Sequence, residues 1–260
     1  MRGRGIGGAA LVALACLCVS FRVRATEPPD LTGRWVLVLV MPAAIELPIV
    51  GRAQLTTIAA LLVDIEQDGA RLTLERTYCF QDVRMTPSLV TTEIPDRFVA
   101  SLAPGSANAR LEEMPGGGWR FVQSPCVEVH GACLLDPERE ALPTNALDLR
   151  VVDQDGDGHP GLTVHVAVAG LLGGDAYVVN RLSTSLEGWI LEDGSIAGAV
   201  QWTSEQTMIG ASDPLLLLSY KYALDPDPAK HFFLLRRIDE PDPCRAIRDN
   251  LASLLGLPPG

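Results

Sequence analysis

The sequence lacks the short motifs that identify the commonest enzyme classes. No G-x-S-x-G nucleophile turn, H-E-x-x-H helix or G-x-x-x-x-G-K-[ST] phosphate loop occurs in its 260 residues. The paired acids Glu112-Glu113, and Glu138 with Glu140, fall in expected loops, where solvated charge is the ordinary state. We therefore expect a non-enzymatic protein. A hydrolase that uses such acids and histidines is the least favoured alternative.

The sequence also has no apolar run of the roughly 20 residues that a membrane-spanning helix needs. The run from Ile6 to Phe21 is shorter, follows two arginines and precedes Val23-Arg24-Ala25. This pattern is typical of a signal peptide. We expect residues 1–25 to be cleaved off and the protein to be exported, to the periplasm, the outer membrane or the extracellular space.

A lipid anchor at Cys16 is the alternative outcome for this segment. Ala13-Leu14-Ala15-Cys16 resembles a lipoprotein cleavage box, but the usual leucine three residues before the cysteine is absent. We therefore favour simple cleavage, with an acyl chain on Cys16 as the alternative.

Basic residues are scarce in the rest of the chain. Without residues 1–25 the chain has 17 basic residues against 32 acidic ones, a net charge of −15. Such a charge repels nucleic acid and anionic lipid at long range, so neither is an expected partner. Cation binding fits this charge better. The other expected partner is an unidentified small molecule or protein.

Residues 26–260 are expected to form one β-rich domain. Apolar and polar residues alternate at 71–76 and 162–168, and Asp68-Gly69 is typical of a tight turn. Other strands are expected at 36–40, 89–93, 97–102, 119–122, 176–182, 187–191, 195–206, 215–222 and 231–238, with a hairpin at 126–135. Pro42 is expected to end the first of them.

Only residues 244–255 have apolar residues at helical spacing, after the start signal Asp242-Pro243. The expected fold is therefore all-β, a mostly antiparallel barrel or sandwich with one C-terminal helix.

Four cysteines remain after the expected cleavage, and an even number in an exported chain indicates two disulfides. Four cysteines allow three pairings. We predict a short bond between Cys126 and Cys133, around His130-Gly131, and a long-range bond between Cys79 and Cys244. A zinc site at Cys126, His130 and Cys133 is disfavoured because no fourth ligand is evident.

An acidic, glycine-rich loop, Asp153-Gln154-Asp155-Gly156-Asp157-Gly158-His159, lies between two apolar runs. Its three carboxylates converge only if the backbone coils, and its glycines supply the positive φ angles that coiling needs. A solvated turn without an ion is the alternative, because Asp and Gly are common in turns.

The loop resembles the D-x-D-x-D-G calcium loops of EF-hands, thrombospondin type 3 repeats and integrin FG-GAP blades. This resemblance implies that Asp153, Asp155, Asp157 and the carbonyl of His159 bind Ca²⁺. The twelfth position, a glutamate in EF-hands, is Val164 here, so we expect a weak affinity, on the order of 10⁻⁴ to 10⁻³ M. A structural calcium site is the predicted function.

The segment Gly33-Arg34-Trp35 at the start of the first expected strand resembles the opening motif of lipocalins and other calycin barrels. In that family the indole closes one end of the barrel beneath an arginine from the last strand. Arg236 and Arg237 stand in the last expected strand and are candidates for this contact. The resemblance implies a barrel, and a carrier of a small apolar ligand is the alternative function.

Overall fold

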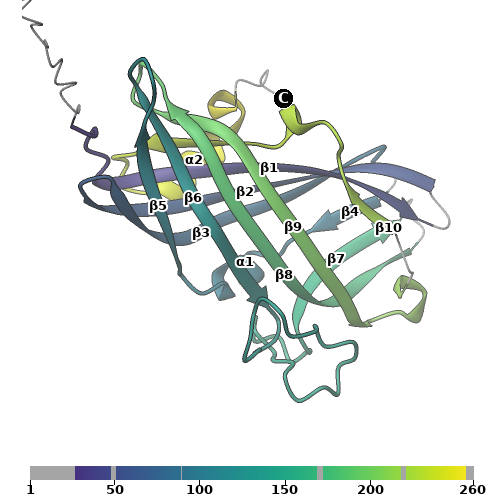
Figure 1. Cartoon of the computed structure of the whole chain (residues 1–260). Coiled ribbons are helices and arrows are strands. Elements are labelled where there is room, and N and C mark those ends of the chain that lie inside the picture. Colours follow the sequence, from purple (N-terminus) through teal and green to yellow (C-terminus); the bar gives the residue numbers. More distant parts are fainter. Residues whose placement is uncertain (1–26, 48–50, 89, 169–171, 218–220, 256–260) are drawn as a thin grey trace, which may run out of the picture.

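The computed structural model describes residues 27–47, 51–88, 90–168, 172–217 and 221–255 (Figure 1). The expected signal peptide and Cys16 lie outside these residues. The described chain is mostly antiparallel β-sheet with one C-terminal helix, which confirms the predicted fold class. None of its helices is both long enough and apolar enough to cross a membrane.

The first strands of the chain are β1 (Gly33–Leu47), β2 (Gly51–Asp68), β3 (Arg71–Thr86), β4 (Val90–Glu93), β5 (Gly105–Glu113) and β6 (Trp119–His130). After a long loop come β7 (Leu162–Val168), β8 (Leu172–Ile190), β9 (Ile196–Ala211), β10 (Lys221–Leu224) and β11 (Phe232–Arg237). The helices are α1 (Asp96–Ser101) and α2 (Pro243–Leu254), with short 3₁₀ turns at η1 (Pro214–Leu216) and η2 (Pro228–Lys230).

The sheet closes on itself into a ring (Figure 1). Its hydrogen-bonded neighbours run β8, β6, β5, β3, β2, β1, β11 and β9, and β9 pairs again with β8. Three shorter strands extend one end of the ring, because β7 pairs with β8, β4 with β7 and β10 with β1. We call this the β7 end and the opposite one the Trp35 end.

The interior is tightly packed at the Trp35 end. Trp35 is 1% exposed, and its indole N–H donates to the carbonyl of Leu31 at 2.7 Å. The Arg237 guanidinium lies 4.7 Å from the centre of the indole and donates to the carbonyls of Asp30 and Thr32. The predicted stacking of an arginine on Trp35 is therefore confirmed, with Arg237 as the partner.

Helix α2 covers part of the outer face of the ring. Its buried residues Ile247 and Leu251 pack on outward-facing side chains of β1, β2 and β3, among them Phe80. A disulfide between Cys79 on β3 and Cys244 in the first turn of α2 fixes the helix there. Both the C-terminal helix and this long-range disulfide are as predicted.

The predicted bond between Cys126 and Cys133 is wrong, because both are free thiols. Strand β6 stays paired with β8 to its last residue, and the chain then enters a loop in which the amide of Cys133 donates to the carbonyl of Arg150. The predicted hairpin at 126–135 therefore does not form. The Cys126 thiol instead packs against the core and accepts a hydrogen bond from Arg76 at 2.9 Å.

The predicted strand at 97–102 is also wrong, since this segment contains α1. Pro95 precedes the helix and Asp96 places an acid in its first turn, both typical of a helix start. The buried residues Phe98, Val99 and Leu102 are spaced as one face of a helix. Six residues are too few for this spacing to be recognised among strands.

Pro42 does not end the first strand, which continues to Leu47. It lies where β1 changes partner, between Val40, paired with β11, and Ala43, paired with β10. The missing N–H therefore interrupts no strand pairing on that edge. The predicted strand at 215–222 is wrong for residues 215–217, because Asp213 accepts from the amide of Leu215 at 2.9 Å and starts the turn η1, and β10 begins only at Lys221.

We predict that replacing Cys79 and Cys244 together by alanine lowers the free energy of unfolding by about 4 to 5 kcal/mol. The bond joins residues 165 positions apart, so its loss frees a long loop in the unfolded chain. Denaturant unfolding of the oxidised proteins measures the difference. The exposed free thiol Cys133 supplies the control, because Cys133→Ala is expected to leave the midpoint unchanged; equal midpoints for all three proteins would contradict the prediction.

Candidate functional site

The β7 end of the ring encloses a cavity of about 230 Å³. One wall comes from β1, β2, β3 and β10, and the other from β4, β6, β7, β8 and β9. Most lining side chains are apolar, for example Met41, Leu55, Val83, Phe98 and Val178. Among the described residues no aspartate, glutamate, lysine or arginine lines it. This composition suits a small and mainly apolar ligand.

The cavity exists because β8 changes partner along its edge. Strand β6 ends at His130, opposite Asn180, and β7 begins at Leu162, opposite Val178. The loop that joins β6 to β7 therefore leaves and re-enters the sheet at one point. Gly161 is required there, since its φ is +84° and a Cβ would lie 2.5 Å from the carbonyl oxygen of Val178.

A buried ion pair lies between the cavity and the packed core. The Arg76 side chain is 2% exposed, and its Nη2 lies 2.9 Å from Glu128 Oε1. Tyr78, which lines the cavity, donates its hydroxyl to Glu128 Oε2 at 2.8 Å. Burial, together with the charge of Glu128, raises the pKa of Tyr78 well above its usual value, so the phenol stays neutral.

The acidic loop, residues 153–161, lies outside the cavity, next to the junction of β6, β7 and β8. Carboxylate oxygens of Asp153, Asp155 and Asp157 lie within 4.8 Å of one another, so the predicted convergence is confirmed. Asp153 accepts from the amides of Asp157 and Gly158 at 3.1 and 2.9 Å. The backbone thus coils around the carboxylates, and positive φ angles at the loop's glycines allow it to do so.

The side chain of Asp155 is more deeply buried than that of Asp157. The Asp155 side chain is 0% exposed, and its Oδ2 accepts from the amide of Thr163 at 3.1 Å. Its Oδ1 is buried without a hydrogen-bond partner among the described residues. A buried carboxylate oxygen without a partner is costly, so the site is suited to a cation that would coordinate it.

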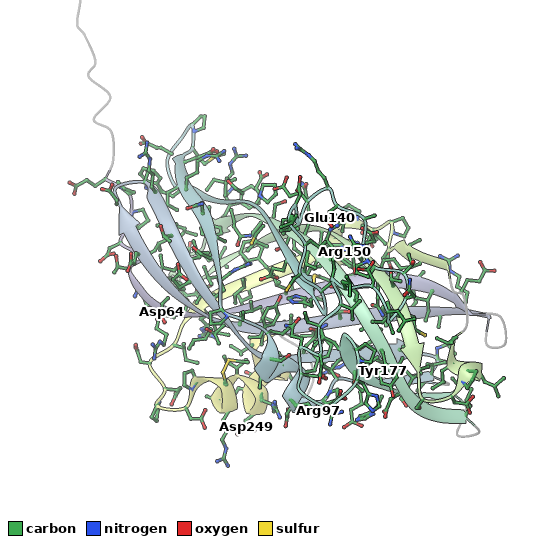
Figure 2. The ribbon with its side chains drawn as sticks, turned by 90° about the horizontal axis from the view of Figure 1, so that it is seen from below. Asp64, Arg97, Glu140, Arg150, Tyr177 and Asp249 are labelled. Carbon is green, nitrogen blue, oxygen red and sulfur yellow. A yellow bond between two sulfur atoms is a disulfide. The ribbon has the colours of Figure 1, made fainter. Side chains whose placement is uncertain are left out.

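The positively charged side chain of Arg97, in α1, pairs with the carboxylates of this loop (Figure 2). Its Nη2 lies 2.9 Å from Asp157 Oδ2, and its Nε lies 3.8 Å from Asp155 Oδ2. Burial raises the pKa of Asp157, but the Thr163 hydroxyl, the amide of His159 and the charge of Arg97 together lower it below its usual value. Asp157 is therefore ionised at neutral pH and available to a metal ion.

The predicted ligand residue His159 lies against the sheet. Its amide donates to Asp157 Oδ1 at 2.8 Å, and its ring stacks on Tyr177 of β8, with ring centres 4.5 Å apart. Gln154 connects the loop to two other elements, because its side chain accepts from the amide of Gly131 and donates to the carbonyl of Ser101 in α1. The acidic loop is thus fixed to α1, β6 and β8.

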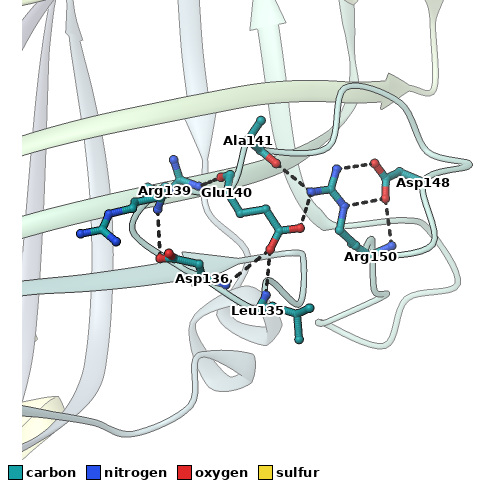
Figure 3. Close-up of polar contacts among 8 residues, drawn as sticks. Leu135, Asp136, Arg139, Glu140, Ala141, Asp148 and Arg150 are labelled. Atoms are coloured by element: carbon teal, nitrogen blue, oxygen red, sulfur yellow. Dashed lines mark hydrogen bonds and ion pairs between the residues drawn. The ribbon is translucent and has the colours of Figure 1, made fainter.

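The chain before the acidic loop is organised by Arg150 (Figure 3). Its guanidinium donates to both carboxylate oxygens of Asp148, to Glu140 Oε1 and to the carbonyl of Ala141. Hydrogen bonds to this arginine lower the pKa of Asp148 to about 2. The cluster closes the segment 133–150 on itself and so fixes the start of the acidic loop.

The sequence did not reveal the cavity, because its lining residues come from distant strands. Among the predicted site residues, the structure brings Asp153, Asp155 and Asp157 together and joins Cys79 to Cys244. The disfavoured zinc set is separated, because His130 lines the cavity while Cys133 is exposed in the following loop. Alternation along β6, β8 and β9 was the only available signal for the lining positions.

Comparisons with protein-family models, with curated proteins and with solved structures found no match. A function for this protein must therefore be inferred from the geometry of the cavity and of the acidic loop.

We predict that Arg150→Gln removes a pH-dependent part of the stability. The folded-state pKa of Asp148 lies below its ordinary value of 3.8, so its contribution is complete above that pH and is lost as the pH falls toward about 2. Unfolding measured from pH 5 to pH 2 should show a steeper loss for the wild type than for the variant. Arg139→Gln is the control, since this neighbouring arginine bonds Asp136 only through its amide; parallel curves for Arg150→Gln and the wild type would contradict the prediction.

Proposed function

We propose that the protein is a binding protein that holds a small, mainly apolar ligand inside the ring of strands. The observation that carries this proposal is the uncharged cavity of about 230 Å³ at the β7 end. Known sites for drug-sized ligands are commonly about 300 to 1,000 Å³, so the ligand expected here is smaller. The Trp35 end is closed by packing, which makes the β7 end the side of entry.

The closed Trp35 end supports the same proposal. Arg237 over Trp35 reproduces the contact expected from the resemblance to calycin barrels, a group that includes carriers of apolar ligands. The disulfide between Cys79 and Cys244 supports export, because such bonds persist in oxidising compartments. We therefore favour an exported, non-enzymatic carrier.

We further propose that the acidic loop binds one Ca²⁺ with a structural role. The specific observation is Asp155, whose buried Oδ1 has no partner among the described residues. The oxygen ligands would come from Asp153, Asp155, Asp157 and the carbonyl of His159. Calcium takes about 6 to 8 oxygen ligands and tolerates irregular coordination geometry. Arg97 would leave the carboxylates when the ion binds.

The carrier proposal predicts saturable uptake of the neutral fluorescent probe N-phenyl-1-naphthylamine. Val83→Trp should abolish most of this uptake, because Val83 lines the cavity and the larger side chain fills it. Fluorescence titration measures the binding. Arg84→Trp is the matched control, because the next residue on β3 is exposed on the opposite face. Equal uptake by the two variants, or no saturable uptake by the wild type, would contradict the proposal.

The calcium proposal predicts a higher melting temperature in excess Ca²⁺ than in excess EDTA. At 10 to 100 times the dissociation constant the ion adds about 1.4 to 2.7 kcal/mol, a shift of several degrees for a chain of this size. Asp155→Asn should remove the shift. Asp64→Asn should retain it, because Asp64 pairs with Arg34 near the Trp35 end.

Arg97→Gln gives a second test of the same site. Without the guanidinium the three carboxylates repel more strongly, so this variant should be less stable in EDTA and gain more from calcium than the wild type. A calcium shift unaffected by either Asp155→Asn or Arg97→Gln would place the ion elsewhere.

A further inference from the structure

Three polar side chains form a row across one wall of the cavity. His130 on β6 is paired with Asn180 on β8, and Asn180 is paired with Gln206 on β9. Directly opposed residues of antiparallel strands face the same side of a sheet, and all three line the cavity. We call these residues the polar row. The rest of this wall is mainly aliphatic.

The polar row has unused hydrogen-bonding capacity. Asn180 donates its amide hydrogens to Ser204 Oγ at 3.0 Å and to the carbonyl of Glu205 at 3.3 Å, which leaves its Oδ1 as an acceptor. Within the described chain, no protein group forms a hydrogen bond with this oxygen, with the His130 ring or with the Gln206 side chain. A ligand that displaces water from this wall must replace these hydrogen bonds or lose affinity.

The electrostatic surroundings of the polar row disfavour a charged ligand. Burial lowers the pKa of His130, against the raising effect of the nearby Glu128 charge, so the imidazole is neutral at pH 7. It then offers one donor and one acceptor. Arg76 of β3, which lies between the cavity and the packed core, is already paired with Glu128 and lines no part of the cavity. A ligand carboxylate would therefore be buried without a counter-charge.

We propose that the ligand is an uncharged, mainly aliphatic molecule with one hydroxyl-like group, and that the polar row binds this group. A hydroxyl both donates and accepts, so it can donate to Asn180 Oδ1 and accept from His130 or Gln206. This inference rests on the proposed binding function and adds the chemical class of the ligand and its point of attachment.

The test is displacement of N-phenyl-1-naphthylamine from the full-length protein at neutral pH by three ligands of similar size. Octanol should displace the probe, octanoate should be at least about tenfold weaker because its charge is unpaired, and methyl heptyl ether, which cannot donate, should be about 2- to 10-fold weaker than octanol. Octanoate as tight as octanol, or ether as tight as octanol, would overturn the inference.

The variant His130→Phe locates the effect. It keeps an aromatic ring beside Tyr78, whose ring centre lies 6.4 Å from that of His130, but has no nitrogen. Octanol should bind about 2- to 10-fold more weakly, and the ether, whose oxygen can accept from the same ring, should weaken to a similar extent. His165→Phe is the control, because His165 pairs with Asp175 and does not line the cavity. Unchanged affinities of both ligands in His130→Phe would overturn the role of His130 in the polar row.

The two proposals fail in different ways. Absence of saturable probe uptake by the wild type overturns the binding function itself. Probe uptake that Val83→Trp blocks, combined with equal affinities for octanol, ether and octanoate, leaves the binding function and overturns the ligand class.

Discussion

The structure depends on the pairing of one long strand, β8, with three others. It pairs with β9 over most of its length, while its other edge pairs first with β7 and then with β6. β8 closes the ring because one edge pairs with β6 and the other with β9, and β6 ends where β8 changes partner, at Val178 to Asn180, beside the cavity. Both Gly131 and Gly161 approach the carbonyl of Val178 too closely for any other residue. The cavity and the acidic loop both follow from this junction.

Local pattern predicted much of the fold where one face of an element is buried. The alternation at 71–76 and 162–168, the Asp68-Gly69 turn and the spacing in 244–255 all correspond to observed elements. The pattern failed where tertiary pairing decides. Pro42 is tolerated only because β1 changes partner there, and no local signal records that change. Cys126 and Cys133 are near in sequence, but the pairing of β6 with β8 keeps them apart.

The sequence predicted the acidic loop but not the polar row, because only the acidic loop is formed by residues that are neighbours in the chain. The three aspartates of the acidic loop are neighbours in the chain, so their convergence needs only local coiling at glycines. The polar row consists of His130, Asn180 and Gln206, which approach one another only through strand pairing. His130 could be considered from the sequence only with the cysteines around it, and nothing local distinguishes the other two. Arg97 was assigned to a strand, so its contact with the acidic loop was also unforeseen.

The acidic loop and the cavity share helix α1, and this helix is the route by which binding at one site would change the affinity of the other. Arg97 binds the carboxylates from one side of α1, while Phe98, the next residue, lines the cavity. Gln154 holds the end of the same helix through the carbonyl of Ser101. A cation that replaces Arg97 therefore removes one polar contact of α1 and leaves those of Gln154 with Ser101 and of Arg248 with Asp96. If the ion changes the position of Phe98, ligand affinity must change, and by linkage the ligand must alter the affinity for the ion by the same factor. If Gln154 and Arg248 hold α1 in place without Arg97, the two sites are independent, and an ion bound at the acidic loop would act only on the stability of the β6 to β7 junction.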